Sequence, residues 1–459
     1  MDQGTSNLGE PLLQSKAVGK TTAPSLLPFY LTNFVRITAF AVAMLPAFTL
    51  RINEFMASSG YGIDAAATAV GTIAALRHLT EFIASPMLST ISDTTGRRPV
   101  ILASCFAFVI ETASLALAPS LTIFAAIHIV GGLFSTSNSV ESSCIADATP
   151  VGPARAVAMG RFLTVIGAAI AVGPVIGGAA TKALGGAVPF MCAAALGLVT
   201  FICEYLFLPE YLSQAQRDAA KKLQQRSSIE RVFPILGLRK LLRSNIVLIR
   251  CASASILSSL GMAMFGSTSS LWMKAAFGWG GQELGRFLSV MGLAVMVSQV
   301  FVLPWLLGFA KGKEIAVAQA TLVLMSVKYL CFALAPSGVW IYVVSILTLP
   351  SFCSISMLSS MSTRHVPSTQ QGLWSGGMSA LSTAAQAVGS MIGSRAFAAT
   401  VKSDGLLGWH LVLPIFTYLL SALCIAHADK ARDVKGVNGG LSKLGSSKEP
   451  NPSDLSLGA

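Results

Sequence analysis

Twelve runs of apolar residues, each long enough to cross a membrane, dominate the chain. A helix that crosses about 30 Å of hydrocarbon needs roughly 20 apolar residues. The runs start near residues 27, 63, 99, 121, 157, 187, 245, 284, 314, 338, 373 and 406. The sequence therefore predicts an all-α membrane protein whose twelve transmembrane helices form two six-helix bundles.

The composition supports a membrane location independently. Hydrophobic residues make up 53% of the 459 residues and charged residues only 11%, which a water-soluble domain of this length does not tolerate on its surface. The eight cysteines fall inside apolar runs, without a CxxC or Cys/His cluster, so we expect packing residues, no disulfide and no metal site. The first 26 residues lack the basic region and cleavage site of a signal peptide.

The sequence contains no phosphate-binding P-loop, nucleophile elbow or zinc-ligand spacing. We therefore predict that the protein is not an enzyme, binds no cofactor and is not driven by ATP.

One long polar stretch lies inside the chain, at about residues 210–244. It predicts a tail over 1–26, an N-terminal bundle over 27–209, a basic linker over 210–244, a C-terminal bundle over 245–427 and a tail over 428–459. Two alternatives remain open for the linker: an amphipathic helix on anionic lipid, or a solvated segment.

Lysine and arginine fall mainly on one side of the predicted spans, and basic loops stay on the cytoplasmic side of a membrane. This bias predicts that both termini are cytoplasmic. It also accounts for most of the net charge of +12 without a nucleic-acid partner. The tetrapeptide Glu10-Pro11-Leu12-Leu13 resembles an acidic dileucine sorting signal, so the plasma membrane and a vacuolar or lysosomal membrane both remain open.

The fifth and eleventh spans share an internal repeat. Three glycines recur with identical spacing after 216 residues: Gly160, Gly173 and Gly177, then Gly376, Gly389 and Gly393. Parallel repeats of six helices are how one class of transporter places a substrate site between two rocking halves. The repeat therefore predicts that these two spans are structural equivalents.

A short charged turn separates the second and third spans and contains Asp93, Gly96, Arg97 and Arg98. It resembles the cytoplasmic loop between helices 2 and 3 of the major facilitator superfamily. The resemblance implies a charge relay that latches one conformation of a transporter. Asp147 and Arg155, before the fifth span, match the same family and extend the predicted latch.

The fifth span contains Gly167 and the segment Gly173-Pro174-Val175-Ile176-Gly177-Gly178. This segment resembles the antiporter motif of the twelve-helix drug:proton antiporter branch, particularly its tetracycline-antiporter-like members. Small residues spaced by four allow close backbone approach, and Pro174 bends a helix, so the motif implies a hinge and a seal. Ordinary small-residue packing is the alternative.

Other matches to this branch lie at the ends of spans. They are Asp147-Ala-Thr-Pro150, Phe207-Leu208-Pro209-Glu210, Phe277-Gly278-Trp279, and Val366-Pro367 with Gln371-Gly372. The chain departs from the family at Ser89 and Thr94 in the charged turn, and at His128, where the family has an arginine. Histidine titrates near neutral pH and arginine does not, so His128 either alters proton coupling or is a packing residue.

Ionisable residues inside a bilayer cost roughly 2.5–3.5 kcal/mol each and are functional candidates. The spans of the first half contain Glu81, Glu111, Glu141 and Glu204, whereas those of the second half contain Arg250, Lys328 and Arg395 and no carboxylate. A proton site is therefore expected in the first half. The order of helices in the family ranks Glu81 and Glu141 above Glu111 and Glu204.

Arg77 and Glu81 lie one helical turn apart on the same face. Two hypotheses follow: a structural ion pair, or a Glu81 that exchanges between Arg77, Arg36 and a proton or cationic substrate. A cavity with Arg36, Arg250 and Glu81 favours an anionic or zwitterionic solute. The alternative for Arg250 is a side chain that reaches the membrane surface.

Together these features predict a monomeric secondary active transporter that moves a small organic solute by alternating access, with proton-coupled antiport as the leading mechanism. Its expected partners are the solute, protons and the lipid bilayer. Two alternatives remain open: a receptor or adaptor that uses the same fold without transport, and a proton-independent uniporter.

Overall fold

The computed structural model describes residues 24–135, 139–150, 153–225, 238, 242, 245–309, 313–366, 371–402 and 407–426. Within these ranges the regular structure is helical and includes no strand. The Glu10-Pro11-Leu12-Leu13 tetrapeptide, most of the predicted linker beyond residue 225 and the tail over 428–459 lie outside the described residues.

The helices of the first half run from Leu27 to Phe207. They are α1 (Leu27–Val42), α2 (Phe48–Ser58), α3 (Ile63–Thr95), α4 (Arg97–Leu117), α5 (Leu121–Gly131), α6 (Ser139–Ala148), α7 (Pro153–Leu184) and α8 (Val188–Phe207). A further helix, α9 (Gln214–Gln225), follows at the start of the predicted linker and packs against α3. Part of the linker is therefore helical, and its contact with lipid stays a prediction.

The helices of the second half begin at Ile246. They are α11 (Ile246–Phe277), α12 (Gly281–Val297), α13 (Leu303–Phe309), α14 (Glu314–Ala333), α15 (Gly338–Leu347), α16 (Ser354–Arg364), α17 (Gln371–Val401) and a last helical segment, Trp409–Ala426. The starting points predicted from the apolar runs agree with these helices to within a few residues.

Several spans are broken, and the breaks have local causes. The first span contains a π-helical turn at Ala43–Ala47 that accommodates Pro46, which has no backbone N–H to donate. The fourth span breaks between α5 and α6 at a 3₁₀ turn that begins at Gly132. The tenth span breaks between α15 and α16 at another 3₁₀ turn, Leu349–Cys353. At this second turn, α15 and α16 are bent by 62° relative to each other.

Among the described residues, nine helical stretches are long and apolar enough to cross a membrane, or ten if the bent pair α15 and α16 is one span. The helices α3 and α17 are 33 and 31 residues long but more polar. They pack along each other at the centre of the molecule, where a polar face does not meet lipid. Large apolar side chains such as Leu198 and Ile202 lie about half exposed on the outside, at 47% and 48%.

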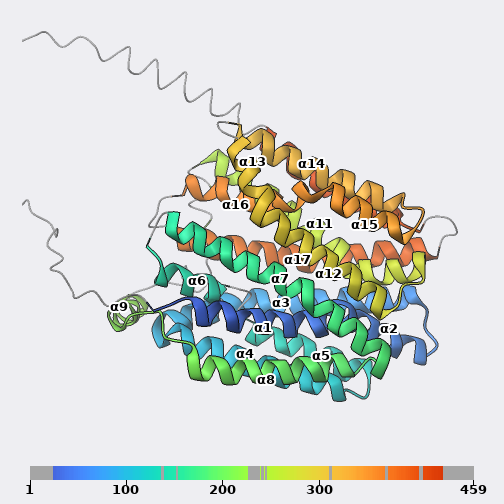
Figure 1. Cartoon of the computed structure of the whole chain (residues 1–459), viewed down its shortest axis with the longest axis horizontal. Helices are drawn as coiled ribbons and strands as arrows, with labels where there is room; N and C mark the ends of the chain where they lie inside the picture. Colours follow the sequence, from blue (N-terminus) through green and yellow to red (C-terminus); the bar gives the residue numbers. More distant parts are fainter. Residues whose placement is uncertain are drawn as a thin grey trace, which may run out of the picture.

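The two halves of the chain lie side by side (Figure 1). The helices of the first half, coloured blue to green, occupy the lower part of the view, and most of those of the second half, coloured yellow to orange, occupy the upper part. α7 packs along α12 and α3 along α17, so these two pairs of helices form the interface between the halves.

Backbones approach closely within this interface. A Cβ on Gly178 of α7 would lie 2.2 Å from the carbonyl oxygen of Gly281 on α12, and one on Gly285 would lie 2.3 Å from that of Pro174. Across the other pair, a Cβ on Gly71 of α3 would lie 2.6 Å from the carbonyl oxygen of Ser390 on α17. These positions require glycine because a side chain would occupy the neighbouring backbone.

The repeated glycines occupy equivalent positions in the two halves. Gly173 and Gly177 pack on the backbone of α1 between Thr38 and Val42. Their counterparts, Gly389 and Gly393, pack in the same way on α11 between Leu260 and Met264. Gly160 and Gly376 both face open space, since no other described part of the chain lies within 4 Å of an added Cβ at either position. The structure therefore supports the predicted equivalence of the fifth and eleventh spans.

We predict that Gly178→Ala lowers stability, because the added methyl group pushes α12 away from α7. Overpacking of this kind costs about 1–3 kcal/mol, and thermal unfolding in detergent measures it. Gly160→Ala is the matched control: it adds the same methyl group to the same helix in open space, and alanine is the better helix former. Equal melting temperatures for the two variants would contradict the tight contact.

Candidate functional site

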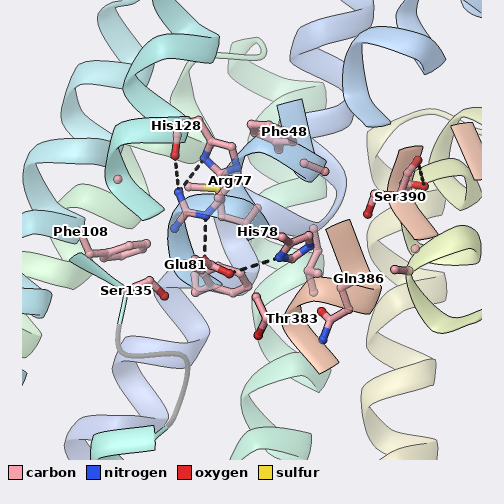
Figure 2. A pocket seen from close by; sticks show the side chains of 18 of the residues that line it. Phe48, Arg77, His78, Glu81, Phe108, His128, Ser135, Thr383, Gln386 and Ser390 are labelled. Atoms are coloured by element: carbon pink, nitrogen blue, oxygen red, sulfur yellow. Dashed lines mark hydrogen bonds and ion pairs between the residues drawn. The ribbon is translucent and has the colours of Figure 1, made fainter. Parts of the chain in front are cut away.

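A cavity of about 770 Å³ lies between the two halves. Among the described residues, the ionisable ones that line it come from the first half: Arg36, Arg77, His78, Glu81, Glu111, His128 and Glu141. The second half contributes uncharged polar and small residues, among them Ser267, Ser379, Ser382, Thr383, Gln386 and Ser390. The cavity therefore has one charged wall and one wall of hydroxyl and amide groups (Figure 2).

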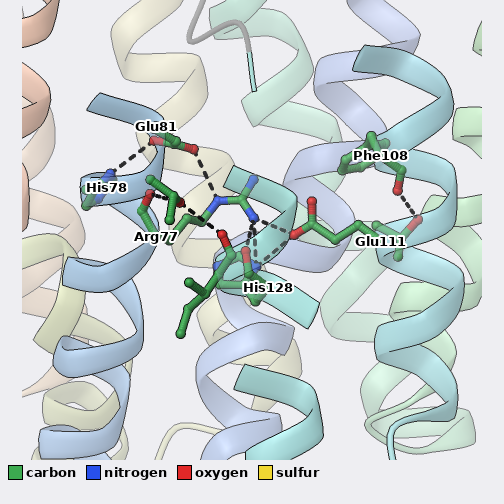
Figure 3. Close-up of polar contacts among 9 residues, drawn as sticks. Arg77, His78, Glu81, Phe108, Glu111 and His128 are labelled. Carbon is green, nitrogen blue, oxygen red and sulfur yellow. Dashed lines mark hydrogen bonds and ion pairs between the residues drawn. The ribbon is translucent and has the colours of Figure 1, made fainter. Parts of the chain in front are cut away.

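Arg77 of α3 is the centre of the charged wall (Figure 3). Its Nε lies 3.1 Å from Glu81 Oε1, and its Nη1 pairs with Glu111 of α4. The same Nη1 donates to the His128 carbonyl oxygen at 2.7 Å. Glu81 also contacts His78, at 3.2 Å from Nδ1. One arginine thus faces two carboxylates.

His128 joins this network through its ring as well as its backbone. Its Nδ1 lies 2.9 Å from Glu111 Oε1 and 3.1 Å from Arg77 Nη1. If Nδ1 carries a proton it donates to Glu111, and if not it accepts from Arg77. The ring also packs on Phe48, with centroids 4.2 Å apart. His128 is therefore both a packing residue and a hydrogen-bonding member of the site, and its effect on proton coupling stays a prediction.

Two glycines let the fourth span approach this network. A Cβ on Gly131 would lie 2.3 Å from Glu111 Oε2, and one on Gly132 would lie 2.2 Å from Thr80 Oγ1. The Thr80 hydroxyl donates to the carbonyl oxygen of Ile129 at 2.9 Å. Gly131 and Gly132 therefore place the end of α5 against α3 and leave room for the Glu111 carboxylate.

Arg36 of α1 forms a second group on the same wall. Its Nη2 donates to Glu141 Oε1 of α6 at 2.7 Å and to Asn33 Oδ1 at 2.6 Å. Its Nε lies 4.0 Å from Glu204 Oε1 of α8. Arg36 is thus paired with Glu141 here, whereas the sequence suggested Glu81 as a partner.

The structure changes the ranking of the buried carboxylates. The Arg77–Glu81 ion pair forms as expected from their spacing. Glu111 and Glu204, ranked lower from helix order, are buried against the two arginines, because α4 and α8 direct these side chains inward rather than toward lipid. Helix order alone does not reveal which face of an outer helix a residue occupies.

Arg250 lies near the start of α11 and is not among the described residues that line this cavity. The part of α11 that reaches the cavity, Met262–Ser267, lies farther along the helix. A contribution of Arg250 to a substrate cavity stays a prediction. Its alternative role, reaching the membrane surface, stays a prediction.

The charged turn between α3 and α4 brings together most of the predicted latch. The Arg97 guanidinium pairs with Asp93 at 2.5 Å and with Asp147 at 2.9 Å. Arg155 donates to the carbonyl oxygens of Ala146 and Thr149 at the end of α6, at 2.7 and 2.8 Å. These contacts tie α3, α4, α6 and α7 of one half together. Their function as a latch stays a prediction.

Glu210 completes this turn, although the sequence marked it only as part of a matching segment. Its two carboxylate oxygens accept from the backbone N–H groups of Arg97 and Arg98, at 3.0 and 3.1 Å. A carboxylate at this position accepts hydrogen bonds from the free N–H groups at the start of α4. Its negative charge also interacts favourably with the positive end of the helix dipole. Gly96 has a φ of 116°, and a Cβ there would lie 2.3 Å from Glu210 Oε2. The Arg98 side chain donates to the Tyr205 carbonyl oxygen at 2.6 Å.

The predicted antiporter motif presents two faces of α7. Gly173 and Gly177 contact α1 of the same half, whereas Gly167, Pro174 and Gly178 contact α12 of the other half. The motif therefore packs closely on both sides, as ordinary small-residue packing and a seal both require. Its role as a hinge stays a prediction.

Polar contacts also link the halves at the end of the molecule where α3 begins, which we call the Asp64 end. Lys402, after α17, lies 3.1 Å from Asp64, and Lys182 of α7 donates to Gln282 of α12 at 2.6 Å. Gly178 and Gly281 meet at the same end. The halves are therefore in contact there, whereas Gly160 and Gly376, toward the opposite end, face open space.

This fold and cavity define a multi-pass membrane protein of the solute-transporter class. A sequence model of the Major Facilitator Superfamily matches residues 26–394, and the chain belongs to this family. Members of the family are transporters rather than enzymes, in agreement with the prediction from motifs.

Curated relatives and solved structures agree with this assignment. The class C tetracycline resistance protein of Escherichia coli is 28% identical over 365 residues, which cover 78% of this chain and 88% of that protein. Human hippocampus abundant transcript-like protein 1 is 24% identical over 310 residues, which cover 67% of this chain and 59% of that protein. The crystal structure of the human organic anion transporter TETRAN matches this fold with a TM-score of 0.63 at 18% sequence identity. The match covers 87% of this chain and 98% of that chain. The predicted family resemblance and fold class are confirmed.

We predict that Glu210→Ala destabilises the turn, because it removes the acceptor of two backbone N–H groups at the start of α4. The loss of a helix cap costs about 0.5–2 kcal/mol, measured as a lower melting temperature in detergent. Glu54→Ala is the control, since Glu54 forms an ion pair with Arg51 in which its side chain is 43% exposed and which contributes at most about 1 kcal/mol. A larger loss in the control would refute the capping role.

Proposed function

We propose that the protein is a secondary active transporter that exchanges a small organic solute for protons by alternating access. The observation that carries this proposal is the cavity between the two halves, with every ionisable lining residue on one wall. Buried ionisable residues in a membrane protein are expensive and mark ion or substrate pathways. A wall that contains Glu81, Glu111 and two histidines has groups able to take up and release protons.

The pairing of the arginines changes the solute class that we propose. The sequence led us to expect an anionic or zwitterionic solute, but Arg77 faces Glu81 and Glu111, and Arg36 faces Glu141. The cavity lining thus holds three carboxylates and two guanidinium groups. This surplus of acid favours a solute with a positively charged group, cationic or zwitterionic, which competes with protons for the same carboxylates.

Glu81 is the residue that we propose to couple solute and proton. It is bonded to Arg77 and His78 on its own helix and lies on the cavity surface, facing the wall formed by Thr383 and Gln386 (Figure 2). A proton on Glu81 weakens its attraction to Arg77, and a cationic solute that binds there displaces the proton. Similarity to tetracycline resistance proteins supports an export direction.

We predict that Glu81→Gln lowers the pH-driven solute flux tenfold or more, because the amide side chain cannot take up and release a proton. The measurement uses purified protein in liposomes with a pH-sensitive dye inside and a panel of organic amines, zwitterions and anions outside. Solute exchange at equal pH on both sides should persist, since it needs no net proton movement.

Glu54→Gln is the matched control, because it removes a carboxylate that does not line the cavity. Undiminished pH-driven flux in Glu81→Gln would exclude Glu81 as the coupling residue. Solute flux without proton movement in the wild-type protein would indicate a uniporter, and no flux of any panel compound would favour the receptor or adaptor alternative.

A further inference from the structure

The second buried carboxylate beside Arg36 has no role in the site described so far. Glu204, near the end of α8, has a relative accessibility of 0%. Within the described part of the chain, neither of its carboxyl oxygens has a hydrogen-bond partner. Its closest cationic atom is Arg36 Nε, 4.0 Å away, which also lacks a hydrogen-bond partner there. A donor and an acceptor thus face each other just beyond hydrogen-bond distance.

Arg36 is already neutralised by another carboxylate. Its Nη2 donates to Glu141 Oε1 at 2.7 Å, and the Glu141 side chain is 1% exposed. One guanidinium therefore serves two buried carboxyl groups. A buried carboxylate without a partner is strongly unfavourable and takes up a proton instead. The group is electrically neutral when one of the two carboxyls is protonated, and the unbonded Glu204 is the one whose geometry fits the acid form.

The surroundings of Glu204 offer no second cation among the described residues. The groups that face it are Arg36 on α1, the Cys105 thiol on α4 and Glu141 on α6. The Cys105 thiol lies 3.7 Å from the Gly197 carbonyl oxygen and also interacts with the Glu204 carboxyl group, and Cys144, on α6 with Glu141, is buried. The opposite face of α8, with Ile202 and Leu206 at 48% and 63% exposure, faces outward. Exchange with water therefore has to pass through the Arg36 and Glu141 side.

We propose that Glu204 holds a proton behind Arg36 and that Glu141, on the cavity surface, is the route by which this proton leaves. In the state described, Glu204 is a neutral acid and Arg36 pairs with the Glu141 carboxylate. When Arg36 Nε closes on Glu204, the proton passes to Glu141, so that Glu204 becomes the paired carboxylate and Glu141 the acid. Glu141 then releases the proton to water in the cavity and recovers its negative charge.

This site is separate from Glu81 and has its own arginine. Its occupancy by a proton follows from the local balance of charge, whereas its use in transport rests on the proposed function. A transporter with both sites binds one proton in competition with solute at Glu81 and stores another behind Arg36. The two roles predict different effects of substitution.

Infrared difference spectroscopy of the protein in lipid at neutral pH tests the proton directly, because a protonated carboxyl has a distinct C=O stretching band. We expect Glu204→Gln to lose one such band relative to wild type. Glu141→Gln should lose the same band although Glu204 is intact, because Arg36 then pairs with Glu204 alone. Arg36→Gln should gain a second band, since Glu204 and Glu141 then lose the guanidinium group that they share. Glu54→Gln should leave the band unchanged.

A Glu204→Gln spectrum identical to that of the wild type would overturn the proposal. If that variant does not fold, Glu141→Gln and Arg36→Gln decide: an unchanged band in Glu141→Gln, or no added band in Arg36→Gln, refutes the charge balance. These spectra need no solute. An absence of transport in the wild type would therefore refute the proposed function and leave the proton on Glu204 intact.

A measurement of proton and solute flux in liposomes then tests whether the proton on Glu204 is released and taken up again during the transport cycle. We expect Glu204→Gln to lower the number of protons moved per solute, with solute exchange at equal pH retained. An unchanged ratio alongside the lost infrared band would mean that the Glu204 proton is permanent, which would overturn the proposed route through Glu141.

Discussion

The cost of placing charge in a low-dielectric interior governs the arrangement of this protein. Arg36 and Arg77 each collect carboxylates from other helices, and these ion pairs cross between α1, α3, α4 and α6. Unpaired, each charge would cost several kcal/mol. The charged residues therefore hold the first half together as a unit, while the described lining residues of the second half are uncharged.

That asymmetry suggests a division of labour between the halves. The first half has the groups that change charge, and the second half has hydroxyl and amide groups that can bind a solute in either charge state. Neutral hydrogen-bonding groups on α17 can remain in contact with a solute while the opposite wall exchanges protons. The coupling of solute movement to proton movement then depends on both walls of the cavity rather than on one residue alone.

Much of the fold was predictable from sequence because it depends on local rules. The spans follow from the length of apolar runs, the Arg77–Glu81 pair from helical spacing, and the equivalence of Gly173 with Gly389 from the repeat. The site was less predictable. Whether Glu111 and Glu204 face inward depends on the rotation of α4 and α8, and the distance along α11 between Arg250 and the cavity is not encoded in the residues beside it. Glu210 reaches Arg97 across a fold that spacing along the chain does not reveal.

The two-sided packing of α7 has a consequence for how this chain can change. Successive residues of a helix are rotated by about 100°, so one inserted residue near Gly173 would rotate the glycines beyond it away from α1. The same insertion would turn Gly178 away from Gly281 on α12. Insertions and deletions in this helix are therefore excluded more strictly than most substitutions, and homologous chains should vary in the length of their loops but not of this segment.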